Sequence, residues 1–245
     1  QMAAMLGKTR LRKLIVGSLA EMTGSPDVLA GEMKAAGQVS EVTWDDSRIR
    51  FADLLDNDGA PEHHPMSDPR EQIAVLQYTG GTTGLPKGAM LTHGNLSAAC
   101  HQFWETTHGN PPVLVEGQER MLAVLPPFHI YALTVNVLFG ILAGAEIIQH
   151  VRFDPAAALA EISQKQVSVF CGVPTMFTAL INHPETPKHS LRSLKYCGSG
   201  GAPLPLEVAQ RFADITGCHL TEGWGMTETS PSGTFTPAQP GGMRK

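Results

Sequence analysis

The chain has 245 residues, of which 42% are hydrophobic and 17% are charged, and its formal net charge is −5 at pH 7. This composition excludes an intrinsically disordered chain, which combines low hydrophobicity with high charge. The slightly negative net charge does not indicate the basic surface that nucleic-acid-binding proteins have, so no nucleic-acid partner is expected. At roughly 150 residues per domain, the length predicts one large domain or two small ones.

The spacing of the cysteines and the length of the apolar segments exclude further classes of protein. Cys100, Cys171, Cys197 and Cys218 are too far apart for a CxxC metal or redox pair, so we expect isolated, buried thiols in a reducing compartment. The apolar residues 130–145 fall short of the roughly 20 that a membrane-spanning helix needs, and they predict a buried helix instead. Because no secretory signal opens the sequence either, we expect a cytoplasmic protein without an integral membrane segment.

Strand and helix patterns alternate along the chain. The expected elements are a strand at 13–16, a helix at 26–36, a long connection at 38–69 with a short helix at 49–55, a strand at 73–78, a helix at 95–106, a strand at 120–125, the apolar helix at 130–145, a strand at 146–149, a helix at 154–164, a strand at 167–171, a helix at 174–181, a strand at 194–197, a helix at 204–216 and a strand at 219–221. This alternation predicts an α/β fold of layered βαβ units around a mostly parallel sheet. Ligands of such folds bind in the loops beyond the carboxyl ends of strands.

The first of these loops is rich in glycine and threonine. Residues 78–88 read YTGGTTGLPKG and follow a predicted strand. The glycines let backbone N–H groups approach a ligand, while the threonine hydroxyls and Lys87 add donors suited to phosphate. The Walker A pattern fails, because Pro86 and Gly88 flank the lysine where Gly and Ser or Thr are required. The alternative interpretation is an ordinary glycine-rich hairpin turn.

A second loop follows the last predicted strand. Trp224 lies between two glycines, where its ring face is accessible for stacking on a flat ligand such as adenine. Thr227 offers a hydroxyl to a phosphate oxygen, and Glu228 offers a hard oxygen for Mg²⁺. The alternative is a structural turn in which the tryptophan fills a gap in the core.

Two other segments carry weaker signals. Residues 198–203 join a strand to a helix, but Pro203 breaks the dinucleotide fingerprint and Cys197 breaks the nucleophile elbow around Ser199. Backbone contact with a base or an acyl group and a plain tight turn both remain open. His129, which introduces the apolar helix, is either a satisfied cap or core residue or a functional group. No histidine pair has the spacing of a helical metal site.

Five stretches occurring in order carry a resemblance to a known family. They are LQYTGGTTGLPKGAMLTHGNL (76–96), LPPFHIYAL (125–133), GVPTMFTAL (172–180), GSGGAPL (198–204) and EGWGMTETSP (222–231). Together they resemble the adenylate-forming superfamily, and within it the fatty acyl-CoA synthetases. The resemblance implies ATP- and Mg²⁺-dependent activation of a medium- or long-chain fatty acid to acyl-AMP, followed by transfer to coenzyme A. It leaves peripheral membrane association and the oligomeric state open.

The resemblance also implies roles for individual residues. The β- and γ-phosphates of ATP would be held by Thr79, Gly80, Gly81, Thr82, Thr83, Gly84 and Lys87. Thr227 would contact the α-phosphate and Glu228 would hold Mg²⁺. Trp224, followed by Gly225, would stack on adenine where the family commonly has tyrosine. Gly200, Gly201 and Ala202 would line the adenine and acyl pocket, and His129 would stand near the carboxylate.

The family extends beyond both ends of the match. Its members continue with an aspartate for the ribose and a mobile C-terminal domain that carries the adenylation lysine, so residues 1–245 are expected to be the central part of the N-terminal adenylation domain. On that basis we expect the 245-residue chain alone to turn over slowly or not at all. Two alternatives are an adenylation enzyme that passes the acyl group to a carrier protein and a nucleotide-binding module without catalysis.

Overall fold

The structure is a computed structural model that describes residues 2–22, 25–37, 39–60, 62–79, 84, 86–109 and 111–236. It divides into two compact units, Gln1–Pro65 and Met66–Lys245, and each is described here by itself. Among the described residues, no helix has the length and apolar character needed to cross a membrane.

The N-terminal unit is small and has little core of its own. Its elements are η1 (Met2–Met5), β1 (Leu14–Val16), η2 (Leu19–Met22), α1 (Pro26–Ala35), β2 (Arg48–Arg50) and α2 (Phe51–Leu55). β1 and β2 pair in parallel, and the sequence did not predict the second of these strands. Helix α1 buries none of its residues, and Ala20 is the buried hydrophobic residue in the described part of this unit.

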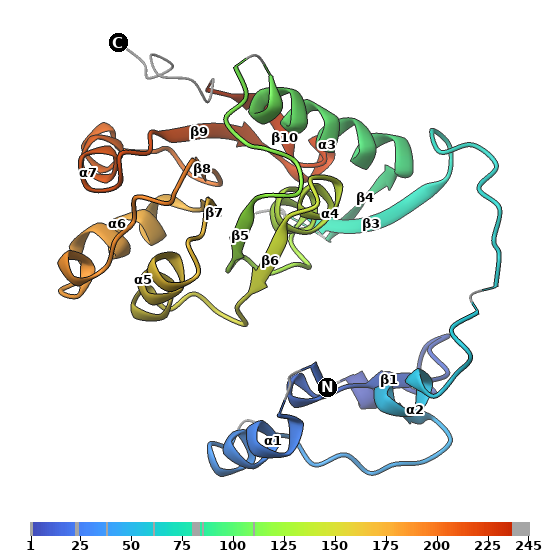
Figure 1. Cartoon of the computed structure of the whole chain (residues 1–245). Coiled ribbons are helices and arrows are strands. Elements are labelled where there is room, and N and C mark those ends of the chain that lie inside the picture. Colours follow the sequence, from blue (N-terminus) through green and yellow to red (C-terminus); the bar gives the residue numbers. More distant parts are fainter. Residues whose placement is uncertain are drawn as a thin grey trace. The chain divides into compact units, whose positions relative to one another are not determined.

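The second unit is built on a six-stranded sheet with the order β10-β9-β8-β7-β5-β6 (Figure 1). The strands are β5 (Arg120–Ala123), β6 (Glu146–Gln149), β7 (Val169–Gly172), β8 (Tyr196–Ser199), β9 (Leu220–Gly225) and β10 (Ser232–Phe235). The first five run parallel and β10 is antiparallel, which confirms the predicted α/β fold with a mostly parallel sheet. The carboxyl ends of the parallel strands therefore meet at one edge.

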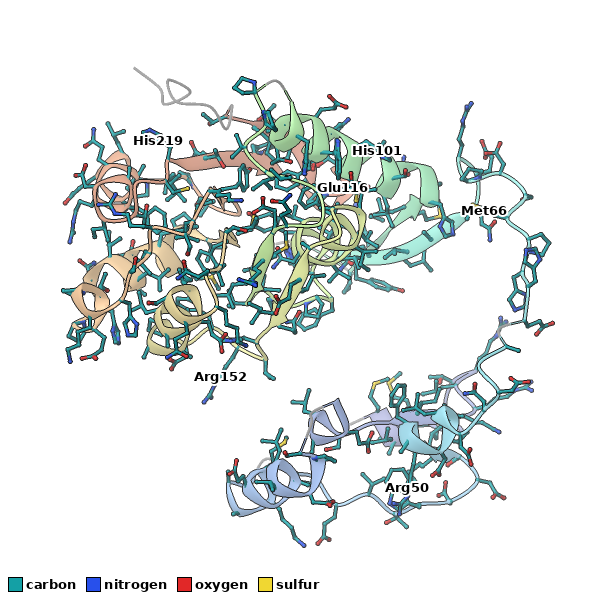
Figure 2. All side chains as sticks on the ribbon, viewed as in Figure 1. Arg50, Met66, His101, Glu116, Arg152 and His219 are labelled. Carbon is teal, nitrogen blue, oxygen red and sulfur yellow. The ribbon has the colours of Figure 1, made fainter. Side chains whose placement is uncertain are left out.

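Helices cover the sheet on both faces (Figure 1). One layer contains α5 (Pro155–Gln164), α6 (Pro174–Asn182) and α7 (Leu206–Thr216), and the other contains α3 (His93–His108), η3 (Ala132–Leu138) and α4 (Phe139–Leu142). The strands supply both cores because successive side chains alternate in direction. Phe170 packs with the first layer, whereas Val169 and Cys171 pack with the second. Figure 2 shows side chains filling the space between these layers.

The apolar segment 130–145 forms a helix of unusual winding. Residues 132–138 are a π-helix, and α4 continues directly from it. Eight of its 16 residues are buried, so the predicted burial holds for half of the segment, and Ile141 is 68% exposed near its end. A π-helix shifts the side chains that follow it relative to an α-helix, and such turns are frequent at functional sites. The sequence pattern gave no sign of this winding.

The glycine- and threonine-rich loop joins two antiparallel strands, β3 (Ile73–Thr79) and β4 (Lys87–Thr92), which form a separate two-stranded sheet. The sequence did not predict β4, because its lysine and glycine at the start are weak strand formers. α3 follows β4 immediately, and the Thr92 side chain caps it by accepting a hydrogen bond from the Asn95 N–H group at 3.2 Å.

The end of the described chain also differs from the prediction. β9 extends to Gly225, so Trp224 lies on a strand instead of in a loop. A short η5 (Thr227–Thr229) then leads into β10, which pairs Thr234 with Trp224. The glycines on either side of Trp224 lowered the apparent strand propensity, and the pairing with β10 overrides it.

Candidate functional site

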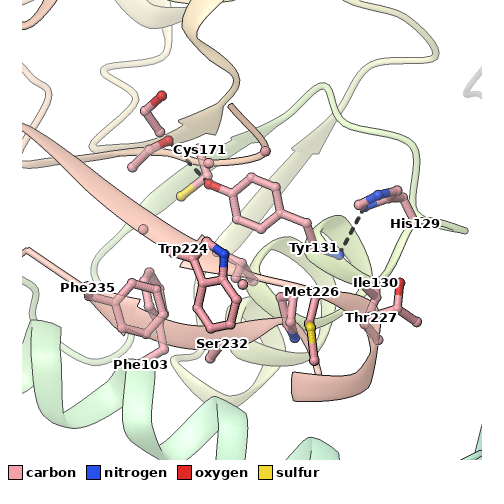
Figure 3. A pocket seen from close by; sticks show the side chains of 18 of the residues that line it. Phe103, His129, Ile130, Tyr131, Cys171, Trp224, Met226, Thr227, Ser232 and Phe235 are labelled. Atoms are coloured by element: carbon pink, nitrogen blue, oxygen red, sulfur yellow. Dashed lines mark hydrogen bonds between the residues drawn. The ribbon is translucent and has the colours of Figure 1, made fainter. Parts of the chain in front are cut away.

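A cavity of about 550 Å³ opens beyond the carboxyl ends of β8 and β9, in the size range of small-molecule sites (Figure 3). Segments far apart in the sequence build it: the end of β3, helix α3, the apolar helix, strand β7, strand β8 with the loop after it, and the β9–β10 region. Its lining residues are Gln77, Tyr78, Thr79, Phe103, His129, Ile130, Tyr131, Val135, Cys171, Tyr196, Gly198, Ser199, Gly200, Gly201, Thr221, Gly223, Trp224, Gly225, Met226, Thr227, Glu228, Pro231, Ser232 and Phe235.

The cavity collects eight of the predicted site residues: Thr79, His129, Gly200, Gly201, Trp224, Gly225, Thr227 and Glu228. The β3–β4 hairpin packs against η5, which brings Thr79 to the same cavity as residues nearly 150 positions later in the chain. Gly84, Lys87 and Ala202 are exposed and do not line the cavity. Gly80, Gly81, Thr82 and Thr83 lie outside the described residues.

The base of the predicted phosphate loop is a closed hairpin. Thr79 pairs with Lys87 across the strands, and its hydroxyl donates a hydrogen bond to the Lys87 carbonyl oxygen at 3.3 Å. The side chain of Lys87 is exposed at the start of β4. The hairpin alternative is therefore right about the connection, and the position of Thr79 in the cavity wall gives the same hairpin access to a ligand.

Trp224 presents its indole to the cavity. The side chain is 59% exposed, which does not fit a tryptophan that fills a gap in the core. A Cβ atom on Gly233 would lie only 2.3 Å from Cε3 of the indole, so the ring rests directly on that glycine. One ring face is thus supported by the β10 backbone, and Figure 3 shows the ring projecting between Tyr131 and Phe235.

The loop after β8 forms another part of the cavity wall. Gly201 has a φ of +78°, a backbone conformation that glycine adopts without strain. A Cβ on Gly200 would approach the Tyr131 ring to 3.3 Å, so the absence of a side chain lets this ring pack against the loop. The Leu204 N–H group donates a hydrogen bond to Glu222 Oε1 at 2.9 Å, which fastens the loop to β9. Glu222 is a positioning residue; it begins the quoted stretch 222–231, but no role was predicted for it.

Thr227 and Glu228 sit on the turn η5 at the cavity mouth. Thr227 is half-buried and Glu228 is exposed. The carboxylate of Glu228 has no hydrogen-bond or ion-pair partner in the part of the chain that the structure describes. That part also holds no cluster of three or more His, Cys, Asp or Glu side chains that could bind a metal ion on its own. A cation held by Glu228 would need further oxygen ligands from a substrate.

His129 caps the start of the apolar helix, as one of its two predicted alternatives requires. Its Nδ1 accepts a hydrogen bond from the Tyr131 N–H group at 3.2 Å, which caps the helix start. In the neutral ring the proton is then on Nε2, which is left to act as a donor toward a ligand. The preceding turn is fixed by Gln77, whose Nε2 donates a hydrogen bond to the Phe128 carbonyl oxygen at 3.1 Å. Gln77 ties the hairpin to the His129 turn; it lies within the quoted stretch 76–96, but no role was predicted for it.

The inner part of the cavity is aromatic and was not predicted. Phe103 and Tyr196 are each 2% exposed, and Phe235 packs against them from β10. The Tyr131 hydroxyl donates a hydrogen bond to the Gly198 carbonyl oxygen at 3.3 Å, and the hydroxyl oxygens of Tyr196 and Thr221 are 3.1 Å apart. These residues come from separate helices and strands, so only the folded structure brings them together.

Most titratable side chains in this inner part are protonated and unreactive at neutral pH. Burial raises the pKa of the Cys171 thiol to about 12, so the thiol is not a nucleophile at neutral pH. All four cysteines are free and buried, as the sequence predicted. Ser199 Oγ and Ser232 Oγ are buried at the cavity wall and have no hydrogen-bond partner within the described residues.

Comparison with known proteins places this architecture in a family. The family model described as "AMP-binding enzyme" matches residues 1–244. The chain is 44% identical over 167 residues to a long-chain-fatty-acid–CoA ligase of Bacillus subtilis, covering 68% of this chain and 29% of the relative. It is 39% identical over 184 residues to a feruloyl-CoA synthase of Amycolatopsis, covering 75% of this chain and 36% of the relative. The chain thus spans about a third of the length of these relatives.

A solved structure is similar in fold and, more distantly, in sequence. The ATP-bound MatB from Rhodopseudomonas palustris aligns with a TM-score of 0.67 and 26% identity, over 94% of this chain and 42% of that chain. The sequence match over residues 1–244, the parallel sheet and the cavity at its carboxyl edge agree. This chain belongs to the AMP-binding enzyme family.

Proposed function

We propose that this chain carries the ATP and carboxylic-acid site of an acid–CoA ligase, as the central part of an adenylation domain. The enzyme joins a medium- or long-chain fatty acid to AMP with release of pyrophosphate and then transfers the acyl group to coenzyme A. The observation that carries the proposal is one cavity with two kinds of wall. Hydroxyl, carboxylate and backbone groups line its mouth, and aromatic side chains line its buried part.

The nucleotide binds at the mouth in this proposal. The hairpin at Thr79 and Lys87 holds the β- and γ-phosphates together with residues 80–84, and the Thr227 hydroxyl contacts the α-phosphate. The indole of Trp224 stacks on adenine, opposite the backbone of Gly200 to Ala202. Support comes from the exposed indole, from the shared cavity and from the ATP-bound relative.

A magnesium ion fits Glu228. Its exposed carboxylate, which has no partner among the described residues, would supply one hard oxygen, and triphosphate oxygens would supply others, as is usual for Mg²⁺ in nucleotide sites. When bound, the ion would neutralise phosphate charge. The role of Glu228 is to place that charge beside Thr227 and so to orient the phosphates.

The acid binds with its carboxylate near His129 and its tail in the aromatic part. In the first step a carboxylate oxygen attacks the α-phosphorus, forming the acyl–phosphate bond as the bond to pyrophosphate breaks. Both reactants are anions, so the catalytic contribution is positioning and charge neutralisation. The Nε2–H group of His129 donates to the carboxylate and holds it in line. In the second step the CoA thiolate attacks the acyl carbon and AMP leaves.

The proposal is tested by supplying the whole protein with ATP, Mg²⁺, CoA and a panel of acids, and by measuring AMP, pyrophosphate and thioester. We expect acid-dependent AMP formation and acyl-CoA. Acid-dependent ATP–pyrophosphate exchange without thioester formation would show adenylation with another acceptor, such as a carrier protein. Absence of exchange with every acid would overturn the proposal.

The proposal also includes the part of the cell in which the protein works. We infer a cytoplasmic enzyme, since its ATP and CoA substrates are found there, with membrane contact at most peripheral. Sedimentation of the whole protein with and without phospholipid vesicles, before and after a high-salt wash, tests this directly.

A further inference from the structure

We propose that Phe103 is the end wall of the acid-binding part of the cavity and that it limits the length of the acid. This inference rests on the proposed function, because it assumes that the tail of the acid occupies the aromatic part. It goes beyond that function by naming the residue that sets the substrate range.

The position of Phe103 is the first observation. It lies in the middle of α3, is 2% exposed and still contributes to the cavity wall. The cavity mouth, by contrast, is formed by exposed groups such as Glu228 and His129. Figure 3 shows His129 at one side of the cavity and Phe103 with Phe235 at the other, with Trp224 between them. Phe103 therefore closes the end that faces away from the mouth.

The second observation is that the Phe103 ring is held on several sides. Its centroid lies 4.4 Å from that of Phe139 and 5.3 Å from that of Tyr196, both in edge-to-face geometry. The ring of Phe235 lies 5.8 Å away in a tilted arrangement. A ring enclosed in this way cannot turn aside for a longer ligand without disturbing the core, because protein interiors are close-packed.

Third, the space behind Phe103 is solid protein. Phe139 and Trp104 pack together with it in the core between α3, the apolar helix and the sheet, and neither lines the cavity. Removing the Phe103 ring would therefore lengthen the cavity by one aromatic ring and no further. Val135, also 2% exposed, lines the same inner end from the π-helix, so a larger side chain there should shorten the cavity.

The test compares F103A, V135F and F212A in the whole protein. Phe212 is a matched control, since it is fully buried in the core on the other sheet face and does not line the cavity. Each variant is assayed for kcat/KM with saturated acids from butanoate to octadecanoate, and with 4-alkylbenzoates of increasing length in case the preferred acid is aromatic. The KM for ATP and the melting temperature are measured in parallel.

We expect F103A to raise kcat/KM for acids two or more methylenes longer than the wild-type optimum, relative to that optimum, by about 10-fold or more. V135F should shift the profile toward shorter acids, and F212A should lower the melting temperature without changing the profile. If F103A does not fold, F103L replaces it with a smaller shift in the same direction.

An unchanged length profile in a folded, active Phe103 variant would overturn the inference while leaving the proposed function intact. The same holds if F212A moves the profile as much as F103A does. A wild-type protein that activates no acid at all would instead remove the proposed function itself.

Discussion

The amino ends and the carboxyl ends of the parallel sheet differ in whether their polar groups are bonded within the protein or available to a ligand. At the amino ends, several polar side chains pair with one another or with backbone groups. Glu119, 1% exposed at its side chain, accepts hydrogen bonds from Lys195 Nζ and from the Val115 N–H group, both at 2.9 Å. Arg120 donates to Glu146 at 2.9 Å and to the Lys165 carbonyl oxygen at 3.1 Å. These contacts join the starts of β5, β6 and β8.

At the carboxyl ends, by contrast, several positions at the cavity either have no side chain or have one that is exposed to solvent. Glycines end β9 and follow β8, Trp224 is more than half exposed, and Glu228 is unpaired among the described residues. Hydrogen bonds made within the protein stabilise the fold, whereas groups left without partners are available to a ligand. Variants at the two ends should therefore have opposite effects on activity and on stability.

The largest effect is expected from Glu228→Ala in the whole protein. Loss of the carboxylate should lower the rate of acid-dependent adenylation by about 100-fold or more, as removal of one electrostatic contact to a transition state commonly does. Stability should stay within about 0.5 kcal/mol, because the side chain is exposed. The rate is read from ATP–pyrophosphate exchange and the stability from urea unfolding. A rate within about threefold of wild type would reject the metal role.

Trp224→Ala should come next. Stacking of a base on an aromatic ring contributes about 1–3 kcal/mol, so the KM for ATP should rise by about 10-fold or more while the KM for the acid changes less. Trp224→Phe keeps a ring face and should recover most of the loss. Steady-state kinetics with ATP varied at saturating acid provide the measurement. Equal values for the alanine and phenylalanine variants would argue against stacking.

At the opposite end of the sheet, Glu119→Ala should destabilise the fold by about 1–3 kcal/mol, because a buried carboxylate that pairs Lys195 and a backbone N–H group is lost. The KM for ATP and for the acid should stay unchanged. Urea unfolding and steady-state kinetics on the same sample separate the two effects. A changed KM with unchanged stability would instead show that Glu119 contributes to substrate binding and not to the stability of the fold.

The pair formed by Glu119 and Lys195 also predicts that the stability of the fold depends on pH. Burial alone raises the pKa of Glu119, but the nearby Ser168 hydroxyl and the hydrogen bonds from Lys195 and Val115 more than offset it and hold the pKa below its usual value of 4.5. The folded state thus binds this proton more weakly than the unfolded state does. The stabilisation is complete above pH 4.5 and is lost as the pH falls through the folded-state pKa. Glu119→Gln should flatten the acid limb of the stability curve.

The smallest effect is expected from Gln77→Leu. It removes the hydrogen bond to the Phe128 carbonyl oxygen and loosens the turn that carries His129. At about 1 kcal/mol, this should lower kcat/KM for the acid by about fivefold and leave the KM for ATP nearly unchanged. An asparagine side chain is too short to reach the Phe128 carbonyl oxygen, so Gln77→Asn should have the same effect as Gln77→Leu. No change in either variant would show that the turn is held by other contacts.

Much of the fold follows from sequence pattern alone. Helices such as α5 and α6 begin at the predicted residues, because Asp154 caps the first, Pro155 and Pro174 fit the first turn of each, and apolar residues recur at helical spacing. The strands β4 and β10 escaped prediction because glycine, lysine and serine have low strand propensity. Each forms only because a neighbouring strand supplies hydrogen bonds.

The site divides in the same way. Sequence by itself predicted a role for Thr79, Trp224, Thr227 and Glu228, which the structure places in the wall of one cavity, because glycine-rich loops with hydroxyl, aromatic and acidic groups at fixed spacing are typical of ligand sites. It could not identify Gln77, Glu222 or Phe103, whose contacts join residues distant in the chain. Only the tertiary structure decides such contacts, since a side chain's partner depends on which strands and helices pack together, and local patterns carry no record of that.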